Sequence, residues 1–371
     1  MKKIKLLTVI GTRPEIIRLS CILKKFDESF DHILVNTSQN YDQNLNKIFF
    51  DDLNIRRPKY IIDHKKKDYI NIIARNLISL DKIITKEKPQ AFFILGDTNS
   101  GLTSYVAKRK KIPIFHYEAG NRCHDENVPE EINRKIIDHI SDVNFTYSEN
   151  SKLNLVKEGL DREYIYNIGS PMYEVLNFYK KKIDNSNILS RLKLTKNNYI
   201  LISTHREENL SKKYYVNQLI QFIKNLKKKT KKNVIVTTQP RLQKYLNKIK
   251  KKDRISFLKP MNFSDYNFLQ INSFMVFSDS GTINEEASIL GFDAINIREN
   301  HERHESMEAG VTVMMPFTNP QIFNAILLTK KNKIKHENRI NNYYDLDVSK
   351  KIVKIILSYI YNIKKKKYFL F

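Results

Sequence analysis

The chain has 371 residues, 41% of them hydrophobic and 28% charged, a globular composition with enough apolar material for about two domains. Its nine glycines are far fewer than the roughly 26 expected at ordinary usage, which excludes collagen-like and glycine-rich linker architectures. The formal net charge is +25, but the lysine runs are scattered over the whole length, whereas a nucleic-acid footprint gathers on one face. We therefore expect a solvated basic surface and no specific nucleic-acid partner.

Cysteine content and hydropathy set the expected compartment. Two cysteines, Cys21 and Cys123, are too few for a disulfide framework. The apolar stretch at the start of the chain ends at Gly11 and is therefore too short for the hydrophobic region of a signal peptide. Elsewhere the sequence has no apolar run of the ~18–20 residues that a membrane span requires. We expect a cytoplasmic protein with no membrane span.

Short runs rich in β-branched and aromatic residues alternate with amphipathic stretches along the chain. Most runs are continuously apolar, as in parallel strands buried on both faces, while residues 14–26 and 214–226 have helical periodicity. Repeated strand–helix units predict an α/β fold with open parallel sheets covered by helices. In chain order, we expect strands at residues 4–10, 32–36, 91–95, 112–117, 143–147, 199–203, 233–237, 255–258, 274–277, 294–297 and 311–314.

The strand–helix alternation pauses at residues 183–198, a polar stretch that we interpret as a connector. We place the domain boundary between Gly169 and Asn198, and divide the chain at residue 175 into two Rossmann-like domains. The tail, residues 346–361, has the pattern of an amphipathic helix that either returns to the first domain or caps the second. Two such domains predict a ligand in the cleft between them, at the carboxyl ends of the strands.

Polar segments follow three strands of the first domain. The first strand leads into a glycine turn that opens a helix, where free N–H groups can bind an anion and Arg13 and Arg18 lie near the helix start. Asp97 and Glu118 each follow a later strand, which places two carboxylates at strand ends. Asp97 fits a cap of the following helix equally well.

A further carboxylate, Glu130, lies in the first turn of a predicted helix. Ile132, Ile136 and Ile140 form an apolar stripe on that helix, and Glu130 lies roughly opposite the stripe. We therefore expect Glu130 to face away from the core side of the helix. Acidic residues in a first turn are commonly only partners of the helix dipole, so a catalytic role requires that the carboxylates converge.

In the second domain, two strands lead into candidate anion-binding segments. His205 and Arg206 follow the strand at 199–203 and suit a phosphate or a developing negative charge. The strand at 274–277 leads into Ser280-Gly281-Thr282, a glycine turn before a helix, where Thr282 and Glu285 have capping-box spacing.

The residue one turn inside that helix, Glu286, would repel phosphate but accept hydrogen bonds from a ribose diol. This combination predicts a nucleoside diphosphate rather than free phosphate. The sequence has no P-loop and no GxGxxG, which disfavours ATP hydrolysis and dinucleotide oxidoreduction. His301 and His304 lack the HExxH spacing of zinc sites, so we expect neither a metal nor a cofactor.

The segments GTRPE, GDTNS, EAGNRC, PEEINR, STHREEN and SDSGTINEE, followed by RENHERHE, occur in this order from residue 11 to about 310. In this set and order the chain resembles the non-hydrolysing UDP-N-acetylglucosamine 2-epimerase family. The resemblance implies two Rossmann-like domains of the glycosyltransferase-B type, a UDP-sugar in the cleft, a homodimer, and a C-terminal helix, residues 350–371, returned to the first domain. The GDTNS, EAGNRC and SGT variants look most like a capsule-associated branch that forms UDP-N-acetyl-L-fucosamine from a 6-deoxy-talo sugar.

The resemblance also implies roles for individual residues. It assigns catalysis to Asp97, Glu118, Glu130 and His205, and it assigns UDP binding to Arg13, Arg18, Gln39, Arg206, Ser280, Gly281, Thr282, Glu286 and Arg303. The implied reaction inverts C2 of a UDP-N-acetylhexosamine by eliminating UDP to a glycal and adding it back. Asp97 and Glu118 are the expected acid/base pair, with Glu130 as an alternative member.

Other functions remain open at this point. A hydrolysing epimerase or a glycosyltransferase of the same fold type would use a similar UDP site, and a nucleic-acid-binding protein is a remote alternative based on the +25 charge.

Overall fold

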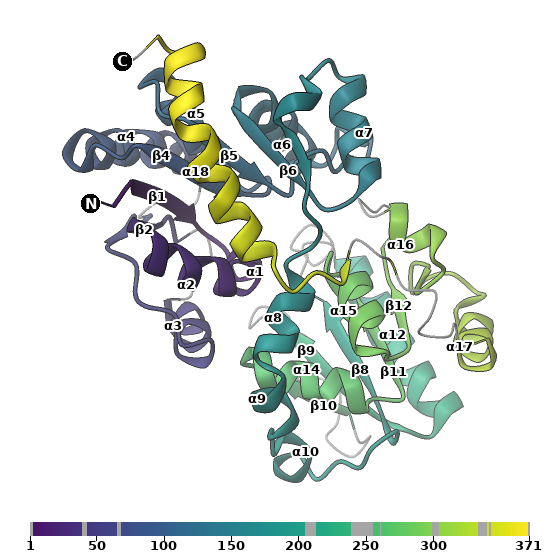
Figure 1. Ribbon diagram of the computed structural model, residues 1–371. Coiled ribbons are helices and arrows are strands. Elements are labelled where there is room, and N and C mark those ends of the chain that lie inside the picture. The colour runs from purple at the N-terminus through teal and green to yellow at the C-terminus, as the bar shows by residue number, and fades with distance from the viewer. Residues whose placement is uncertain are drawn as a thin grey trace. The chain divides into compact units, whose positions relative to one another are not determined.

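The computed structural model divides the chain into two compact units, Met1–Phe178 with Asn342–Phe371, and Tyr179–Asn341. Each unit is an α/β structure built on a parallel sheet (Figure 1). The structure describes residues 3–38, 43–64, 68–204, 213–238, 255–259, 261–298, 304–332, 340 and 343–369.

The sheet of the first unit has the strand order β3-β2-β1-β4-β5-β6-β7, and all neighbouring strands are parallel. The order reverses between β1 and β4, so this is the doubly wound arrangement in which ligands bind beyond the carboxyl ends of the strands. The strands are β1 (Lys5–Ile10), β2 (Asp31–Asn36), β3 (Tyr60–Ile61), β4 (Ala91–Leu95), β5 (Ile114–Tyr117), β6 (Val143–Thr146) and β7 (Ile165–Asn167).

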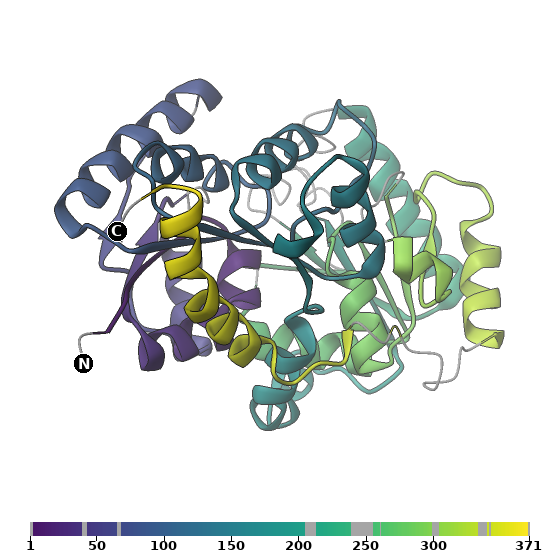
Figure 2. The ribbon, with the colours of Figure 1, turned by 45° about the horizontal axis from the view of Figure 1, so that its top comes forward.

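Helices flank this sheet, and the C-terminal helix is one of them. Of the two alternatives for the tail, the structure shows α18 packed along α2 within the first unit (Figures 1 and 2). Ser349 of α18 donates from its backbone N to Glu174 at 2.9 Å, and Tyr368 beyond α18 donates to Asp142 Oδ2 at 2.7 Å. The helices are α1 (Arg13–Arg18), α2 (Ser20–Ser29), α3 (Gln43–Asp52), α4 (Tyr69–Glu87), α5 (Ser104–Arg109), α6 (Pro129–Ile140), α7 (Glu149–Lys157), α8 (Met172–Phe178) and α18 (Val348–Lys366), with 3-10 turns η1 (Gly101–Thr103) and η2 (Arg162–Tyr164).

The second unit repeats the same topology. Its sheet has the order β10-β9-β8-β11-β12-β13, again parallel throughout. The strands are β8 (Tyr199–Thr204), β9 (Asn233–Thr238), β10 (Ile255–Leu258), β11 (Met275–Ser278), β12 (Ala294–Asn296) and β13 (Val313–Met314). The helices are α9 (Lys180–Asp184), α10 (Ile188–Arg191), α12 (Lys213–Thr230), α14 (Phe263–Asn272), α15 (Ile283–Leu290), α16 (His304–Glu308) and α17 (Ile322–Lys331).

The strand predictions are confirmed for the interior of both sheets. Every expected strand is present, with ends shifted by at most two residues; the interior strands are buried on both faces, whereas the edge strands β10 and β13 are only partly buried. Two strands were not predicted, β3 and β7, which are edge strands of only two and three residues. Within the described part of the chain, no helix is long and apolar enough to cross a membrane.

Two helical expectations are wrong in detail. Residues 14–26 do not form one helix: α1 ends at Arg18 and α2 begins at Ser20. The polar stretch at 183–198, interpreted as a connector, is partly helical, because α10 lies within it and Ile188 is buried against the second sheet's core. Leu189, Leu192 and Leu194 pack against the same core, so several apolar residues in this polar segment anchor the short helix.

Candidate active site

The loop after β1 is tied down by a buried carboxylate. Glu15 in α1 accepts hydrogen bonds from the backbone N of Gly11 at 2.7 Å and of Thr12 at 2.5 Å. Its other oxygen accepts from Thr98 Oγ1, in the loop after β4, at 2.8 Å. Burial raises the pKa of Glu15 above its ordinary value, and these hydrogen bonds offset part of that effect.

This arrangement corrects the anion site predicted at the first glycine turn. The N–H groups of Gly11 and Thr12 are already satisfied by Glu15, so they do not serve as free donors. The signal was present in the sequence, because Thr12 and Glu15 have capping-box spacing, and the structure shows that box. Arg13 lies at the start of α1 with its guanidinium 5.9 Å from the centre of the Phe49 ring.

Glu118 follows β5 and is held by an arginine from α1. Arg18 Nη1 lies 2.5 Å from Glu118 Oε2, and both side chains are almost completely buried. The backbone of Glu118 is left-handed, with φ of 73°. This turn brings the carboxylate over Gly96, where an added Cβ would lie 3.2 Å from Glu118 Oε2. Two predicted site residues, Arg18 and Glu118, are therefore in contact.

Asp97 is paired with an arginine from α6. Arg134 forms an ion pair with the Asp97 carboxylate, and Asn133 Nδ2 donates to the Asp97 backbone oxygen at 2.9 Å. The alternative in which Asp97 caps the next helix is not what the structure shows, since η1 follows Ser100 with no side-chain cap. Arg134 was missed as a site residue, although it stands in the quoted segment PEEINR.

The orientation of α6 differs from the expectation. Ile132 and Ile136 are 50% and 45% exposed, so the apolar stripe does not face the core. The buried face is mainly polar, comprising Glu131, Asn133, Arg134, Ile137 and Asp138. Polar side chains can be buried on this face of α6 because they form hydrogen bonds and ion pairs with one another and with neighbouring loops.

The two adjacent glutamates of α6 are consequently in different environments. Glu130 is exposed, whereas Glu131 is buried and accepts from Arg134 Nη1 at 3.2 Å and from Cys123 N at 3.1 Å. Glu131 is thus occupied in holding the loop before α6. Glu130 keeps an accessible carboxylate at the helix start, and its catalytic role stays a prediction.

In the second unit, the predicted glycine turn follows β11 as expected, but the capping box is wrong. Thr282 makes no side-chain cap; its hydroxyl lies 2.9 Å from Ser280 Oγ, and its backbone N donates to Ser280 Oγ at 3.3 Å. Glu286 is buried in α15 and accepts from Gln270 Nε2 at 2.7 Å. The turn therefore presents small side chains beside a buried carboxylate.

A basic residue that the sequence analysis missed lies against this turn. Arg298 follows β12 and donates from Nε to the Asp279 backbone oxygen at 2.6 Å. Its guanidinium nitrogens lie 3.8 Å from the position that a Cβ on Gly281 would take. The position of Arg298 after a strand end was the available signal, and a guanidinium there suits a diphosphate.

Four predicted site residues fall outside the described residues: Gln39, His205, Arg206 and Arg303. Of the other nine, Arg13 and Glu130 lie at the starts of α1 and α6, and the remaining seven form two groups, one in each unit. Asp97 and Glu118 follow the carboxyl ends of β4 and β5, and Arg18 of α1 contacts Glu118; Ser280, Gly281, Thr282 and Glu286 follow β11 in the second unit. In the part of the chain that the structure describes, no cluster of histidine, cysteine, aspartate and glutamate is suited to a metal ion.

Comparison with known proteins gives consistent matches along the chain. The family model for UDP-N-acetylglucosamine 2-epimerase matches residues 24–357. A UDP-N-acetylglucosamine 2-epimerase from Methanocaldococcus jannaschii is 33% identical over 345 residues, covering 90% of this chain and 94% of the relative.

Solved structures agree with these sequence matches. A UDP-N-acetylglucosamine 2-epimerase from Rickettsia bellii has a TM-score of 0.91 at 44% identity, covering 99% of this chain and 100% of that one. The Methanocaldococcus jannaschii UDP-GlcNAc 2-epimerase in complex with UDP-GlcNAc and UDP has a TM-score of 0.88 at 31% identity, covering 96% and 100%. The predicted fold class, two Rossmann-like domains of the glycosyltransferase-B type, is confirmed.

Proposed function

The chain belongs to the UDP-N-acetylglucosamine 2-epimerase family, a family of isomerases, and we propose that it inverts C2 of a UDP-N-acetylhexosamine without net hydrolysis. The observation that carries this proposal is the pair of arginine-bound carboxylates at the ends of two adjacent strands. Asp97 follows β4 with Arg134 as its partner, and Glu118 follows β5 with Arg18 as its partner.

The chemistry explains why carboxylates are wanted here. The proton on C2 of a hexosamine is not acidified by a neighbouring carbonyl, so its direct removal is difficult. Elimination solves this problem: a carboxylate takes the C2 proton, the C1–O bond breaks, UDP leaves and a C1–C2 double bond forms. UDP then adds back to C1 while an acid protonates C2 from the opposite face, which inverts that centre.

Asp97 and Glu118 supply this acid/base pair in the proposal, with the exposed Glu130 as an alternative member. Arg18 and Arg134 hold the two carboxylates in fixed orientations, which a proton transfer to a defined carbon requires. His205 completes the proposed catalytic set and contacts the leaving diphosphate.

UDP binding is proposed for the second unit. The turn Ser280-Gly281-Thr282 brings backbone and hydroxyl groups to the diphosphate, Arg298 adds positive charge beside it, and Glu286 accepts from the ribose. The Methanocaldococcus jannaschii relative, which is crystallised with UDP-GlcNAc and UDP, supports this ligand class. Arg13, Gln39, Arg206 and Arg303 complete the proposed UDP contacts.

Finer features belong to the same proposal. The substrate is UDP-GlcNAc with UDP-ManNAc as product, or the 6-deoxy-L-talo sugar with UDP-N-acetyl-L-fucosamine as product, in either case for surface polysaccharide such as capsule or O-antigen. The enzyme acts as a cytoplasmic homodimer without a cofactor. The choice of sugar is supported by the GDTNS, EAGNRC and SGT variants of the segments and by the relatives' reaction class, whereas the homodimer follows from the family resemblance and the compartment from the two cysteines.

The deciding experiment is proton NMR of the enzyme with each candidate UDP-N-acetylhexosamine in D2O. We expect deuterium at C2 of a sugar that still carries UDP, and much slower exchange with Glu118→Gln and Asp97→Asn variants. Irreversible release of free sugar and UDP would indicate a hydrolysing epimerase instead. Absence of exchange with every candidate sugar would refute the proposal.

A further inference from the structure

A buried polar network lies beneath the loop that carries Glu118. Asp138 of α6 is completely buried, and three nitrogen atoms lie close to its carboxylate: His116 Nδ1 at 2.9 Å, Arg122 Nη2 at 2.8 Å and Gly120 N, which donates a hydrogen bond at 3.2 Å. Burial alone would raise the pKa of Asp138, but the contacts with His116 and Arg122 outweigh it and hold that pKa below its usual range.

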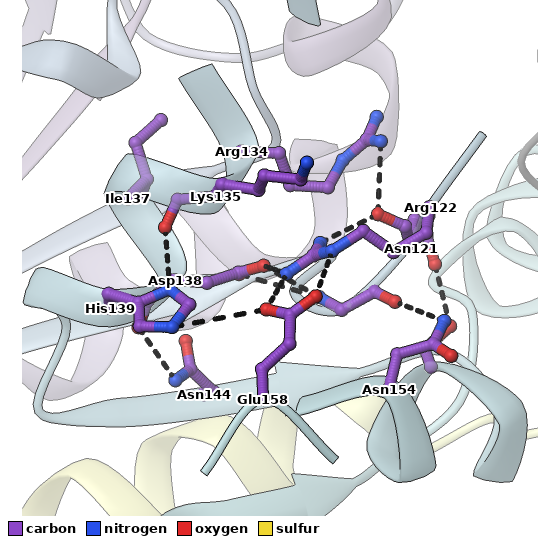
Figure 3. Close-up of polar contacts among 12 residues, drawn as sticks. Asn121, Arg122, Arg134, Lys135, Ile137, Asp138, His139, Asn144, Asn154 and Glu158 are labelled. Carbon is purple, nitrogen blue, oxygen red and sulfur yellow. Dashed lines mark hydrogen bonds and ion pairs between the residues drawn. The ribbon is translucent and has the colours of Figure 1, made fainter. Parts of the chain in front are cut away.

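Arg122 continues the network to Glu158, the residue directly after α7. Its Nε and Nη2 donate to the two oxygens of Glu158 at 2.7 and 2.6 Å, a bidentate pair that fixes the guanidinium in one plane. Figure 3 shows this guanidinium in contact with the carboxylates of Asp138 and Glu158. The loop after β5 is thus anchored to two helices.

The network surrounds one residue of the proposed catalytic pair. The residues that contact Asp138 lie on both sides of Glu118 in the sequence: His116 precedes it, and Gly120 and Arg122 follow it. Both Glu118 and Gly120 have left-handed backbones, with φ of 73° and 76°. A left-handed conformation costs a non-glycine residue about 1–2 kcal/mol, so the surrounding contacts have to hold it in place.

The same network reaches the loop that carries Asp97. His116 Nε2 lies 3.0 Å from the Gly96 backbone oxygen, one residue before Asp97. Arg134, the partner of Asp97, donates to the Asn121 backbone oxygen at 3.0 Å, and Arg122 donates to that oxygen at 2.8 Å (Figure 3). One set of contacts therefore bridges the two loops that end β4 and β5.

We propose that His116 and Asp138 are positioning residues for the epimerisation, which set the relative placement of the Asp97 and Glu118 carboxylates without touching the substrate. This inference rests on the proposed function of those two carboxylates. His116 is central because it is completely buried and its two ring nitrogens contact different elements, Nδ1 the Asp138 carboxylate of α6 and Nε2 the Gly96 backbone oxygen in the loop after β4. Asp138 is central because its carboxylate contacts His116 of β5, Gly120 in the turn after β5, and Arg122.

The test compares His116→Gln and Asp138→Asn with the wild type. Glutamine keeps a donor near the Nε2 position, toward Gly96, and loses the contact with Asp138. Both variants should turn over about 10- to 100-fold more slowly, because sub-ångström misplacement of a reacting group has effects of this size. KM, and the Kd and stoichiometry of UDP measured by calorimetry, should stay near the wild-type values.

Asp142→Asn is the matched control. Asp142 is equally buried in the same unit and accepts from Lys108 at 2.7 Å, from Tyr368 at 2.7 Å and from the backbone N of Ile114 at 2.9 Å. It therefore anchors the amino end of β5, opposite the end that leads into Glu118. This variant should lose thermal stability and keep the wild-type kcat.

The outcomes separate the two proposals. Full kcat in His116→Gln, or a kcat loss matched by an equal loss of UDP-binding sites, would overturn the positioning role. The first result would show that His116 does not affect turnover. The second would show that turnover falls only because part of the protein is unfolded. If Asp138→Asn does not fold, His116→Gln alone decides the question. A wild-type enzyme without C2 exchange would refute the proposed function, and the positioning role with it.

Discussion

Alanine at position 96 should disturb the Glu118 carboxylate from below. Gly96 has φ of +69°, and a Cβ there would lie 3.2 Å from Glu118 Oε2, closer than ordinary van der Waals contact. Gly96→Ala therefore carries two costs. The left-handed backbone costs about 1–2 kcal/mol, and the carboxylate must move by some tenths of an ångström away from its 2.5 Å contact with Arg18.

Gly159→Ala separates these two costs. Gly159 is also left-handed, with φ of +88°, but an added Cβ would meet no atom within 4 Å. Both variants should lose about 1–2 kcal/mol of stability, and each kcal/mol lowers Tm by about 2–4 °C in a unit of this size. Only Gly96→Ala should also lose turnover, by about tenfold or more.

The assay is kcat and KM for C2 epimerisation together with thermal unfolding of both variants. A Gly96→Ala enzyme with wild-type kcat would show that the position of the Glu118 carboxylate is not critical. Equal kcat losses in the two variants would show that backbone strain, and not the displaced carboxylate, causes the defect. Either result would refute the geometric argument.

Three further predictions concern the first unit. Burial raises the pKa of the Cys21 thiol to about 12, so a thiol reagent at pH 8 should leave Cys21 unmodified in the folded protein. Peptide mapping by mass spectrometry measures this modification, and rapid labelling of Cys21 in the folded protein would contradict its burial. Tyr368→Phe removes a hydrogen bond to the buried Asp142, so denaturant titration should show a free energy of unfolding lower by about 1–3 kcal/mol. An unchanged free energy of unfolding would show that the Tyr368–Asp142 hydrogen bond does not stabilise the fold. Burial raises the pKa of Glu174, so the folded chain retains a proton that the unfolded chain releases, and stability should fall as pH rises from about 4.5 through the raised pKa. Glu174→Gln should flatten that part of the stability–pH curve, and a variant with the wild-type slope would exclude Glu174 as its source.

Much of the fold could be predicted because the interior strands are apolar on both faces. The run Ala91–Leu95 shows this directly: all five residues are buried, and the predicted strand ends at the observed residue. Asp97 and Glu118 were placed at strand ends for the same reason, since the apolar run stops where the chain leaves the sheet. Edge strands such as β3 carry no such run and were missed.

The environment of the carboxylates could not be predicted from local pattern. On α6, the isoleucine spacing predicted that the isoleucine face is buried in the core. The structure instead buries a different face, which contains Glu131, Arg134 and Asp138. A polar residue becomes buried only where distant parts of the chain supply its partners, and a helix sequence does not contain that information. Arg134 acquires its role from Asp97, which lies 37 residues earlier.

By itself, the sequence determined the two parallel-sheet units, the strand ends at which candidate side chains lie, and the family resemblance. Local hydrophobicity and turn chemistry act over a few residues, so a single sequence is sufficient to indicate them. Only the tertiary structure decided that Arg18 holds Glu118, that Arg134 holds Asp97, and that His116 bridges their loops. Those contacts join segments from α1 to α6, and their geometry depends on how the strands are ordered in the sheet.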